Sequence, residues 1–347
     1  MSEFRYGIEH EVAFRRADGR FADFTNTDFQ EFQQIIDQLP EYNSDSHSLR
    51  RGDAGIRRKR WYIEGFERYS EDGKLLTCVP KGIEIRTTIQ TSIEDALSEL
   101  QTSYQLLVDA AQTAGFTPYA TSYNPEQLAF VPNPPLNTFE QEQQRQGYPE
   151  ENETALIPMM TYGPDLNLSL SGMDDATLFD IGKKLTWYSP FMVPFSFGLP
   201  TPHRLAWSGI SLRTFQRTGP RPAVQVFPAT DTYWLDTRPT LTKAPRYAAE
   251  IGRIEFKAFD SCADFQLYGA LLTILKGLVL DETLPERALI PCTRLHQLAA
   301  REGFNNPALY QMGKRLLQAA EHALQTDADR HRLALLTPLL ETPLLAA

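Results

Sequence analysis

Four segments of the chain alternate apolar and polar residues with a period of two, which is the pattern of a strand with one buried face. In the first of them, Glu9 and Glu11 lie on one face while Ile8 and Val12 lie on the other. The four segments are RYGIEHEVAF (5–14), KGIEIRTTI (81–89), GPDLNLSLSG (163–172) and GRIEFKAF (252–259). This pattern predicts an antiparallel sheet with one apolar face and one polar face.

Longer segments place apolar residues three and four positions apart, which predicts amphipathic helices. The clearest helix starts at Ser92, with Asp95 three residues on as in a capped first turn, and stops at Gly115. The segment 263–281 is apolar nearly all round, so we expect it to be buried. Further helices are predicted near 27–38, at 174–188, and as two or three helices from Arg294 to about Leu340.

These elements predict an α+β fold with one curved, largely antiparallel sheet of about six strands and helices on one face. We expect residues 1–347 to form a single domain, in which residues 282–347 are a helical C-terminal extension. Residues 124–154 are rich in Pro, Asn, Gln and Glu, which predicts a loop that wraps the surface or covers a site.

Composition restricts the class of protein. The 347 residues carry a formal net charge of −10, which opposes general nucleic-acid binding. No apolar run approaches the length of a membrane span, and the N-terminus lacks the apolar core of a signal peptide. Cys78, Cys262 and Cys292 form no CxxC, which argues against a thiol zinc site or a disulfide framework. We therefore expect a cytoplasmic protein that acts on small molecules, with neither nucleic acid nor a membrane as a partner.

One basic run, RRGDAGIRRKRW, extends from Arg50 to Trp61. A solvated loop or hairpin arm is the plain interpretation of such a run. Phosphate binding is a second interpretation. RNA binding is a third, which the acidic net charge of the chain opposes.

The polar faces of the four predicted strands carry carboxylates near potential cations. Crowded carboxylates repel one another unless a cation neutralises them. The candidate ligands are hard oxygen donors without thiolate partners, which favours Mg²⁺ or Mn²⁺ over structural zinc. A solvated sheet face is the alternative for any single strand. The candidate metal ligands are Glu9, Glu11, Glu84, Asp165 and Glu255.

Basic residues adjoin these acids. Arg86 and Lys257 share strand faces with glutamates, so each could bind phosphate or simply pair with its neighbour. The arginines of GISLRTFQRTGPRP, which are Arg213, Arg217 and Arg221, look exposed and suit forked hydrogen bonds to phosphate or carboxylate. Acids for metal beside bases for phosphate indicate ATP chemistry. The chain has no GxxxxGK[ST] and no GxGxxG after a strand, so P-loop and Rossmann sites lack support.

The order and spacing of these motifs resemble the glutamate–cysteine ligase type 2, or carboxylate–amine ligase, family. The match runs from about residue 6 to about residue 280, through GIEHEV, KGIEIRTT, GPDLNLSLSG, WSGISLRT and GRIEFKAFD. The resemblance implies a glutamine-synthetase-like catalytic fold and a homodimer or higher oligomer. It also implies that ATP phosphorylates the side-chain carboxylate of glutamate, and that an amine, typically that of cysteine, then attacks the acyl phosphate. Two or three divalent ions would bridge the phosphates.

The resemblance assigns roles to particular residues. Glu9 and Glu11 match the first-strand metal ligands, and Glu84 and Glu255 match later acidic ligands. Arg213 matches a substrate-binding arginine, and we expect Arg217 to assist it. Catalytic roles are expected for Arg86 and for Lys257, which stands where the family has an arginine.

The sequence also departs from the family pattern. Asp165 and Asn167 replace a frequent His-x-His, so we expect Asp165 to bind metal and Asn167 to bind substrate. Lys257 keeps the charge of the family's arginine but loses its fork, and Pro80 stands where relatives tend to have an acid.

We therefore expect an ATP- and Mg²⁺-dependent glutamate–cysteine ligase, which makes γ-glutamylcysteine for glutathione biosynthesis. The alternative is a relative that binds nucleotide or amino acid for regulation without turnover, which the departures at Asp165, Asn167 and Lys257 favour. Two further residues are expected to be structural. His10 lies on the apolar side of its strand, and Cys262 has no evident base beside it.

Overall fold

The computed structural model describes residues 3–43, 45, 59–145, 149–198, 207–229, 237 and 239–342. It confirms the predicted α+β class, with a curled, antiparallel half-barrel sheet of six strands. Every neighbouring pair along the sheet is antiparallel. The order is β3 (Trp61–Tyr69), β4 (Leu75–Arg86), β1 (Phe4–Arg16), β6 (Pro164–Leu170), β8 (Ile254–Phe256) and β7 (Val224–Val226). Two short strands, β2 (Phe21–Ala22) and β5 (Phe116–Tyr119), pair with the later part of β1.

The long strand β1 is central to the sheet, with β4 on one side and β6 on the other. Glu9 lies opposite Arg86 of β4 and Asp165 of β6, while Glu11 lies opposite Glu84. Gly82 permits this pairing, because a Cβ at that position would lie 2.4 Å from the carbonyl oxygen of Val12. The predicted alternation therefore brings the polar side chains of separate strands into register on one face.

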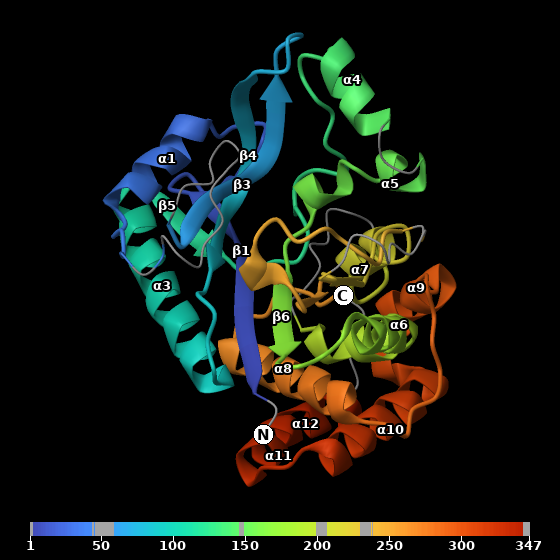
Figure 1. The fold of residues 1–347 in the computed structure, drawn as a ribbon. Coiled ribbons are helices and arrows are strands. Elements are labelled where there is room, and N and C mark those ends of the chain that lie inside the picture. Colours follow the sequence, from blue (N-terminus) through green and yellow to red (C-terminus); the bar gives the residue numbers. More distant parts are fainter. Residues whose placement is uncertain are drawn as a thin grey trace.

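Helices cover the apolar face of the sheet. Figure 1 shows α1 (Phe29–Gln38) and α3 (Ile93–Thr113) on one side of β1, with α8 (Phe265–Leu280) packed beneath the strands. The predicted ends of α3 are confirmed, because Ser92 Oγ accepts from Asp95 N at 3.1 Å and Gly115 has a left-handed φ of +80°. The predicted helix at 174–188 continues further, as α6 (Asp175–Met192).

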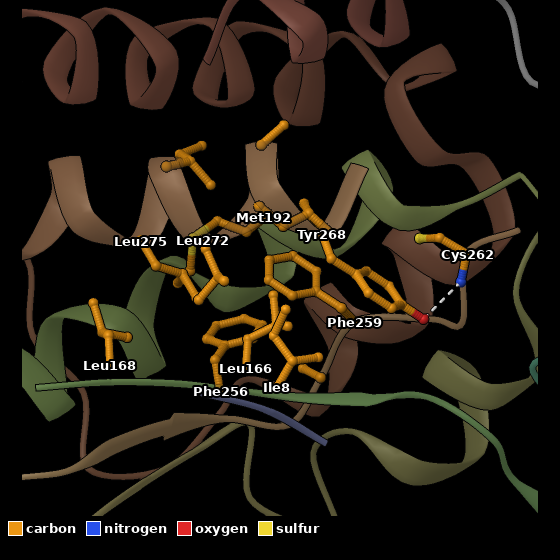
Figure 2. Packing of buried hydrophobic residues seen from close by; sticks show 14 of the residues in the cluster. Ile8, Leu166, Leu168, Met192, Phe256, Phe259, Cys262, Tyr268, Leu272 and Leu275 are labelled. Atoms are coloured by element: carbon orange, nitrogen blue, oxygen red, sulfur yellow. Dashed lines mark hydrogen bonds between the residues drawn. The ribbon is translucent and has the colours of Figure 1, made fainter. Parts of the chain in front are cut away.

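The core lies between the sheet and α8, as predicted from the apolar character of 263–281. Figure 2 shows Ile8, Leu166 and Phe256 pointing from the strands toward Leu272 and Leu275 of α8. The Tyr268 hydroxyl accepts from the Cys262 amide at 3.0 Å and lies 3.0 Å from Nδ1 of His10. Burial lowers the pKa of His10 to about 3, so this histidine is a neutral core residue, as predicted.

The C-terminal region contains four α-helices where two or three were expected. They are α9 (Thr293–Glu302), α10 (Pro307–Ala323), α11 (Asp327–Leu333) and α12 (Thr337–Glu341). Helix α10 packs closely on α8, because a Cβ at Gly277 would lie 2.6 Å from the Cβ of Ala320. The extension therefore shares the main core with the sheet and its covering helices.

The segment predicted as a loop, 124–154, contains two short helices, α4 (Thr138–Arg145) and α5 (Pro149–Glu153). Arg68 of β3 fixes the first of them through a two-pronged pair with Glu140, at 2.7 and 3.0 Å. Hydrogen bonds from Arg68 lower the pKa of Glu140 to about 2. A buried ion pair that composition cannot indicate therefore orders this segment.

Several other expectations can be compared with the described residues. Cys262 is buried, as predicted, Cys78 is also buried, and Cys292 is exposed. No helix in the described ranges is both long and apolar enough to cross a bilayer.

The basic run lies mostly outside the described residues, which resume at residue 59. Lys59 is 7% exposed and donates to the Ile36 and Leu39 carbonyls at 3.0 Å. Arg60 pairs with Asp45 and Glu99, at 3.2 and 2.8 Å. These last two cations of the run therefore brace the fold.

Candidate functional site

Two groups of three carboxylates lie on the polar face of the sheet. Strand β1 contributes one glutamate to each, because Glu9 faces β6 and Glu11 faces β4. The β6–β8 trio comprises Glu9, Asp165 and Glu255, and the β3–β4 trio comprises Glu11, Glu64 and Glu84. Within each trio, one oxygen of every carboxylate lies within 4.8 Å of the others. The expected clustering of acids therefore occurs twice, on adjacent parts of one surface.

Two basic side chains neutralise the β6–β8 trio. Lys257 Nζ hydrogen-bonds Asp165 and lies 3.1 Å from Oε2 of Glu255. Arg253 approaches from the other side, at 3.8 Å from Glu9 and 3.6 Å from Glu255. The Arg253 guanidinium also lies over the ring of Phe227, 4.0 Å from its centroid. Three acids therefore face two fixed cations.

Among the described residues, Lys81 is the one basic residue that forms an ion pair within 4.0 Å with a member of the β3–β4 trio. Its ammonium is 1% exposed and donates to Glu11 at 2.7 Å and to the Pro158 and Thr161 carbonyls at 2.7 and 2.8 Å. The amide of Gly163 donates to the other oxygen of Glu11 at 2.9 Å. Glu11 is therefore held by two donors, whereas Lys81 forms no ion pair with Glu64 or Glu84.

The pKa values reflect this difference in charge. Burial raises the pKa of Glu64 to about 7 despite the nearby Lys81 ammonium. Burial, with the carboxylates of Glu64 and Glu9 adding to it, raises the pKa of Glu84 well above its ordinary value. Burial acts on Glu255 as well, but the ammonium of Lys257 and the other nearby cations outweigh it and lower the pKa of Glu255 to about 2. The β3–β4 trio is therefore the one with unbalanced negative charge.

Asp165 and Lys257 show the same competition within the β6–β8 trio. Burial raises the pKa of Asp165 to about 6, although the ammonium of Lys257 opposes the shift. The pKa of Lys257 is raised despite burial, because Asp165 and Glu255 flank its ammonium. The lysine therefore keeps its charge within the trio.

A cleft of about 550 Å³ opens over the β6–β8 trio. Six of the ten predicted site residues line it: Glu9, Arg86, Asp165, Asn167, Glu255 and Lys257. Its other cations are Arg5, Lys243, Arg246 and Arg253, and its apolar walls include Phe227, Tyr247 and Ile251. An acidic centre surrounded by cations and apolar rings provides complementary contacts for a phosphorylated ligand.

Two acceptor oxygens in this cleft lack a hydrogen-bond donor. They are Oδ1 of Asn167, which is 7% exposed, and Oε2 of Glu255, which is 3% exposed. Oε2 lies near Lys257 without hydrogen-bond geometry. Asn167 and Glu255 are opposite each other on β6 and β8. A buried acceptor without a partner is costly, so Oδ1 of Asn167 favours a bound donor or cation, whereas Oε2 of Glu255 already has the Lys257 ammonium 3.1 Å away.

Three arginines were expected to be exposed, and the structure corrects this: Arg213 and Arg217 are buried, and Arg221 is half-buried and donates to the Thr154 carbonyl at 3.3 Å. Arg213 lies in α7 (Leu212–Arg217), is 3% exposed and donates to the Ala258 and Lys257 carbonyls at 3.1 and 3.0 Å. Arg217 is 6% exposed, and burial lowers its pKa to about 9. Neither lines the cleft: Arg213 lies against the backbone just after β8, Arg217 donates to the Pro222 carbonyl at 3.2 Å, and their role in substrate binding stays a prediction.

Both trios consist of hard oxygen donors, which are the ligands that divalent ions such as Mg²⁺ prefer. The β3–β4 trio fits such an ion, because Glu64 and Glu84 are crowded acids whose charge one lysine leaves unbalanced. The β6–β8 trio fits less well, since Lys257 and Arg253 already pair with its three acids.

Glu64 is the residue of this surface that the sequence pattern missed. It lies on β3, where a register shift between Glu64 and Gly65 interrupts the period-two alternation. Gly65 pairs with Pro80, the position where the resembling family tends to have an acid. Lys81, Lys243 and Arg253 are basic residues that were also not assigned roles.

No protein family and no curated protein matches the sequence. Solved structures do match, and one has a TM-score of 0.51: a bifunctional glutathione synthetase from Pasteurella multocida, at 12% sequence identity. The match covers 98% of this chain and 46% of that chain. At this identity the likeness shows the fold alone.

Two further solved structures match with lower scores. One is glutamate–cysteine ligase from Francisella tularensis in complex with AMP, with 10% identity, a TM-score of 0.48, and coverage of 98% of this chain and 82% of that chain. The other is the ligase PafA in complex with the prokaryotic ubiquitin-like protein Pup, with 11% identity and a TM-score of 0.46. That match covers 98% of this chain and 64% of PafA, so this chain spans less than two thirds of PafA.

Proposed function

We propose that this protein is an ATP- and divalent-metal-dependent carboxylate–amine ligase. It would activate the γ-carboxylate of glutamate as an acyl phosphate and join it to an amine, with cysteine as the first amine to test. The order and spacing of the sequence motifs support glutamate chemistry. We further propose that residues 1–347 act as one catalytic domain with a helical extension from residue 282.

The single observation that carries the proposal is the pair of carboxylate trios beside a cleft lined by cations. Glu9 and Glu11 place one acid in each trio from a single strand, so both trios face the same substrate region. A cleft of about 550 Å³ is within the usual range for a small-molecule site. Acids for metal beside cations for phosphate are what phosphoryl transfer requires.

Bound to Glu11, Glu64 and Glu84, a divalent ion would supply positive charge next to the phosphates of ATP. Glu11 is prepared for this role, because Lys81 and the Gly163 amide fix both of its oxygens. Arg86 and Lys243 line the cleft beside the β6–β8 trio and can offset the charge of a transferred phosphoryl group. These residues would position the divalent ion and offset the negative charge of the phosphates. None of them is required as a nucleophile.

The proposed reaction has two steps that balance. In the first, a γ-carboxylate oxygen of glutamate attacks the γ-phosphorus of ATP, and the bond to the β-phosphate oxygen breaks to release ADP. In the second, the amine nitrogen attacks the acyl carbon, inorganic phosphate leaves, and the amine loses its extra proton. Positioning of the two substrates within one site supplies much of the rate in such a reaction.

A second candidate is a binding protein that holds nucleotide or amino acid without turnover. The observation that favours it is the position of Lys257, whose ammonium pairs with Asp165 and Glu255. An ammonium engaged in this way is less available to a phosphoryl group than the forked arginine of the resembling family would be. This candidate predicts ligand binding with no release of ADP.

The test is ATP turnover by purified protein with Mg²⁺ and glutamate, with and without cysteine and then other amines. The companion variant is Glu9→Gln/Glu11→Gln, which removes one acid from each trio. ADP release that requires both substrates and is lost in the variant would support the ligase. ATP binding without turnover for any glutamate and amine pair would favour the binding protein.

A further inference from the structure

The β6–β8 trio raises the question of which cation its acids hold. We propose that the ammonium of Lys257 is the resident cation of this trio and stands where a divalent ion would otherwise bind. The inference deepens the proposed function, on which it rests for the role of the site. It predicts that the protein binds one divalent ion, at the β3–β4 trio, and uses a lysine charge at the other.

The ammonium of Lys257 lies among the oxygens of the trio. Its Nζ hydrogen-bonds Asp165 and lies 3.1 Å from Glu255, so it lies between two members of the trio. Asp165 and Lys257 are 92 positions apart in sequence, and the pairing of β6 with β8 brings them together. A divalent ion bound to the same oxygens would have to share their negative charge with the lysine.

Arg253 strengthens this conclusion from the opposite side. It lies 3.8 Å from Glu9 and 3.6 Å from Glu255, and its guanidinium is held over the Phe227 ring. Arg253 also pairs with Glu250 at 3.3 Å, so its charge is shared, but the trio has two built-in cations beside it. A divalent ion bound to the same carboxylates would lie close to both fixed cations, and the repulsion between these like charges is unfavourable in a partly buried place.

The trio is nevertheless built from oxygen donors that suit a cation. Beside it, Oδ1 of Asn167 is a buried acceptor without a hydrogen bond, and Asn167 lines the same cleft. Removal of the lysine would leave three carboxylates with one oxygen of each within 4.8 Å of the others. Such a set of oxygen donors suits Mg²⁺ or Mn²⁺. Lys257 is therefore what excludes the metal.

The experiment counts Mn²⁺ bound per chain by electron paramagnetic resonance, with Mn²⁺ alone and no ATP. The wild-type protein should bind one ion, and Lys257→Met should bind two. The additional ion should disappear in the double variant Lys257→Met/Asp165→Asn. Lys257→Arg keeps the charge and should bind one ion, as the wild type does.

Lys243→Met is the matched control. Lys243 lines the same cleft but forms no ion pair within 4.0 Å in the described part of the chain. The Lys243→Met variant loses one positive charge from the cleft, as Lys257→Met does. Because Lys243 is not paired with the trio, this variant should still bind one Mn²⁺ ion. A count of two in this control would mean that general loss of positive charge creates the site, which would contradict the proposal.

The single variant Asp165→Asn tests the proposal even where Lys257→Met does not fold. If Lys257 is the resident cation, Asp165→Asn should leave the wild-type count unchanged. A wild-type count of two that falls to one in Asp165→Asn would overturn the proposal, as would a folded Lys257→Met that gains no ion.

The count also separates this inference from the proposed function. If the wild type binds no Mn²⁺ while Lys257→Met binds one, the lysine proposal stands and the metal role of the β3–β4 trio fails. If the counts are as expected but no substrates promote ATP turnover, the ligase fails and the lysine proposal stands.

Discussion

The two carboxylate trios contain similar chemistry in different electrostatic surroundings. Both take one glutamate from β1 and two acids from other strands, and both lie on one face of the sheet. The β6–β8 trio has Lys257 and Arg253 beside it, and the pKa of Glu255 is lowered to about 2. The β3–β4 trio has Lys81 on one member, and the pKa of Glu64 is raised to about 7.

The difference indicates that the basic residues, more than the acids, decide what each trio can bind. In the β6–β8 trio, Lys257 and Arg253 pair with the acids, so the trio forms a network of ion pairs that also lines the cleft. Acids whose charge is unbalanced form a place where a divalent ion removes an existing repulsion. The following predictions test this division between the trios.

The largest expected effect comes from Glu84→Gln, which removes one ligand from the β3–β4 trio. We expect Mg²⁺-dependent turnover to fall roughly 100-fold or more, since even indirect partners of metal ligands cost about 10- to 100-fold. Steady-state ADP release with saturating substrates measures the effect. Glu67→Gln is the control, since Glu67 also lies on this hairpin but belongs to neither trio. Equal turnover in both variants would refute a metal role for this trio.

The second expected effect is stabilisation by divalent ions. Mg²⁺ at about 100 times its dissociation constant should raise the free energy of unfolding by about 2.7 kcal/mol, because it binds only the folded protein. Chelation with EDTA should reverse the increase. Thermal unfolding of the wild type, Glu84→Gln and Asp165→Asn measures it. Asp165→Asn should keep the stabilisation and Glu84→Gln should lose it, and the opposite result would exchange the roles of the trios.

The third expected effect concerns the support beneath the β6–β8 trio. A Cβ at Gly163 would lie 2.5 Å from the buried guanidinium of Arg213, which braces the backbone at Lys257. Gly163→Ala should lower the free energy of unfolding by about 1–3 kcal/mol through overpacking. Gly7→Ala is the control, because its Cβ would make an ordinary 3.7 Å contact with Asn167. Urea denaturation measures both, and equal stability would show that Arg213 can move aside.

The last expected effect is a pH dependence from Glu64 in metal-free protein. Its carboxyl has a pKa of about 7 when folded and near the model-compound value of 4.5 when unfolded. Between these values the folded state holds a proton that the unfolded state has released. The free energy of unfolding therefore falls as the pH rises, by at most about 1.4 kcal/mol per pH unit, and the effect levels off above about pH 7.

The comparison of wild type with Glu64→Gln in EDTA isolates this dependence. The comparison is needed because His10 and His296 have lowered pKa values, about 3 and about 4, and act with the opposite sign. Urea denaturation at pH 5, 6 and 7 measures the difference. A difference that does not change with pH would mean that Glu64 ionises normally in the folded protein.

Much of the fold was predictable because its signals are local. The alternation of Ile8, Glu9 and Val12 depends only on strand geometry, and the structure confirms it. The ends of α3 depend on Ser92 and Gly115, which act within a few residues of the helix. The apolar character of 263–281 likewise predicted a buried helix, which is α8.

The parts of the site that were missed depend on non-local contacts. Glu64 escaped notice because the irregularity at Gly65 interrupts the alternation of β3. Arg213 lies in a stretch whose composition looks exposed, yet the end of β8 buries it. Neither feature has a signature within its own segment.

The sequence by itself determined which side chains share a face, because the periods of strands and helices are properties of the local backbone. It therefore indicated an acidic face and the residue types that could bind metal and phosphate. Only the tertiary structure decided how those acids are grouped, since the strand order places Glu9 with Asp165 and Glu11 with Glu84. The same order sets Lys257 against Asp165, and the electrostatics of each trio follow from such neighbours across the sheet.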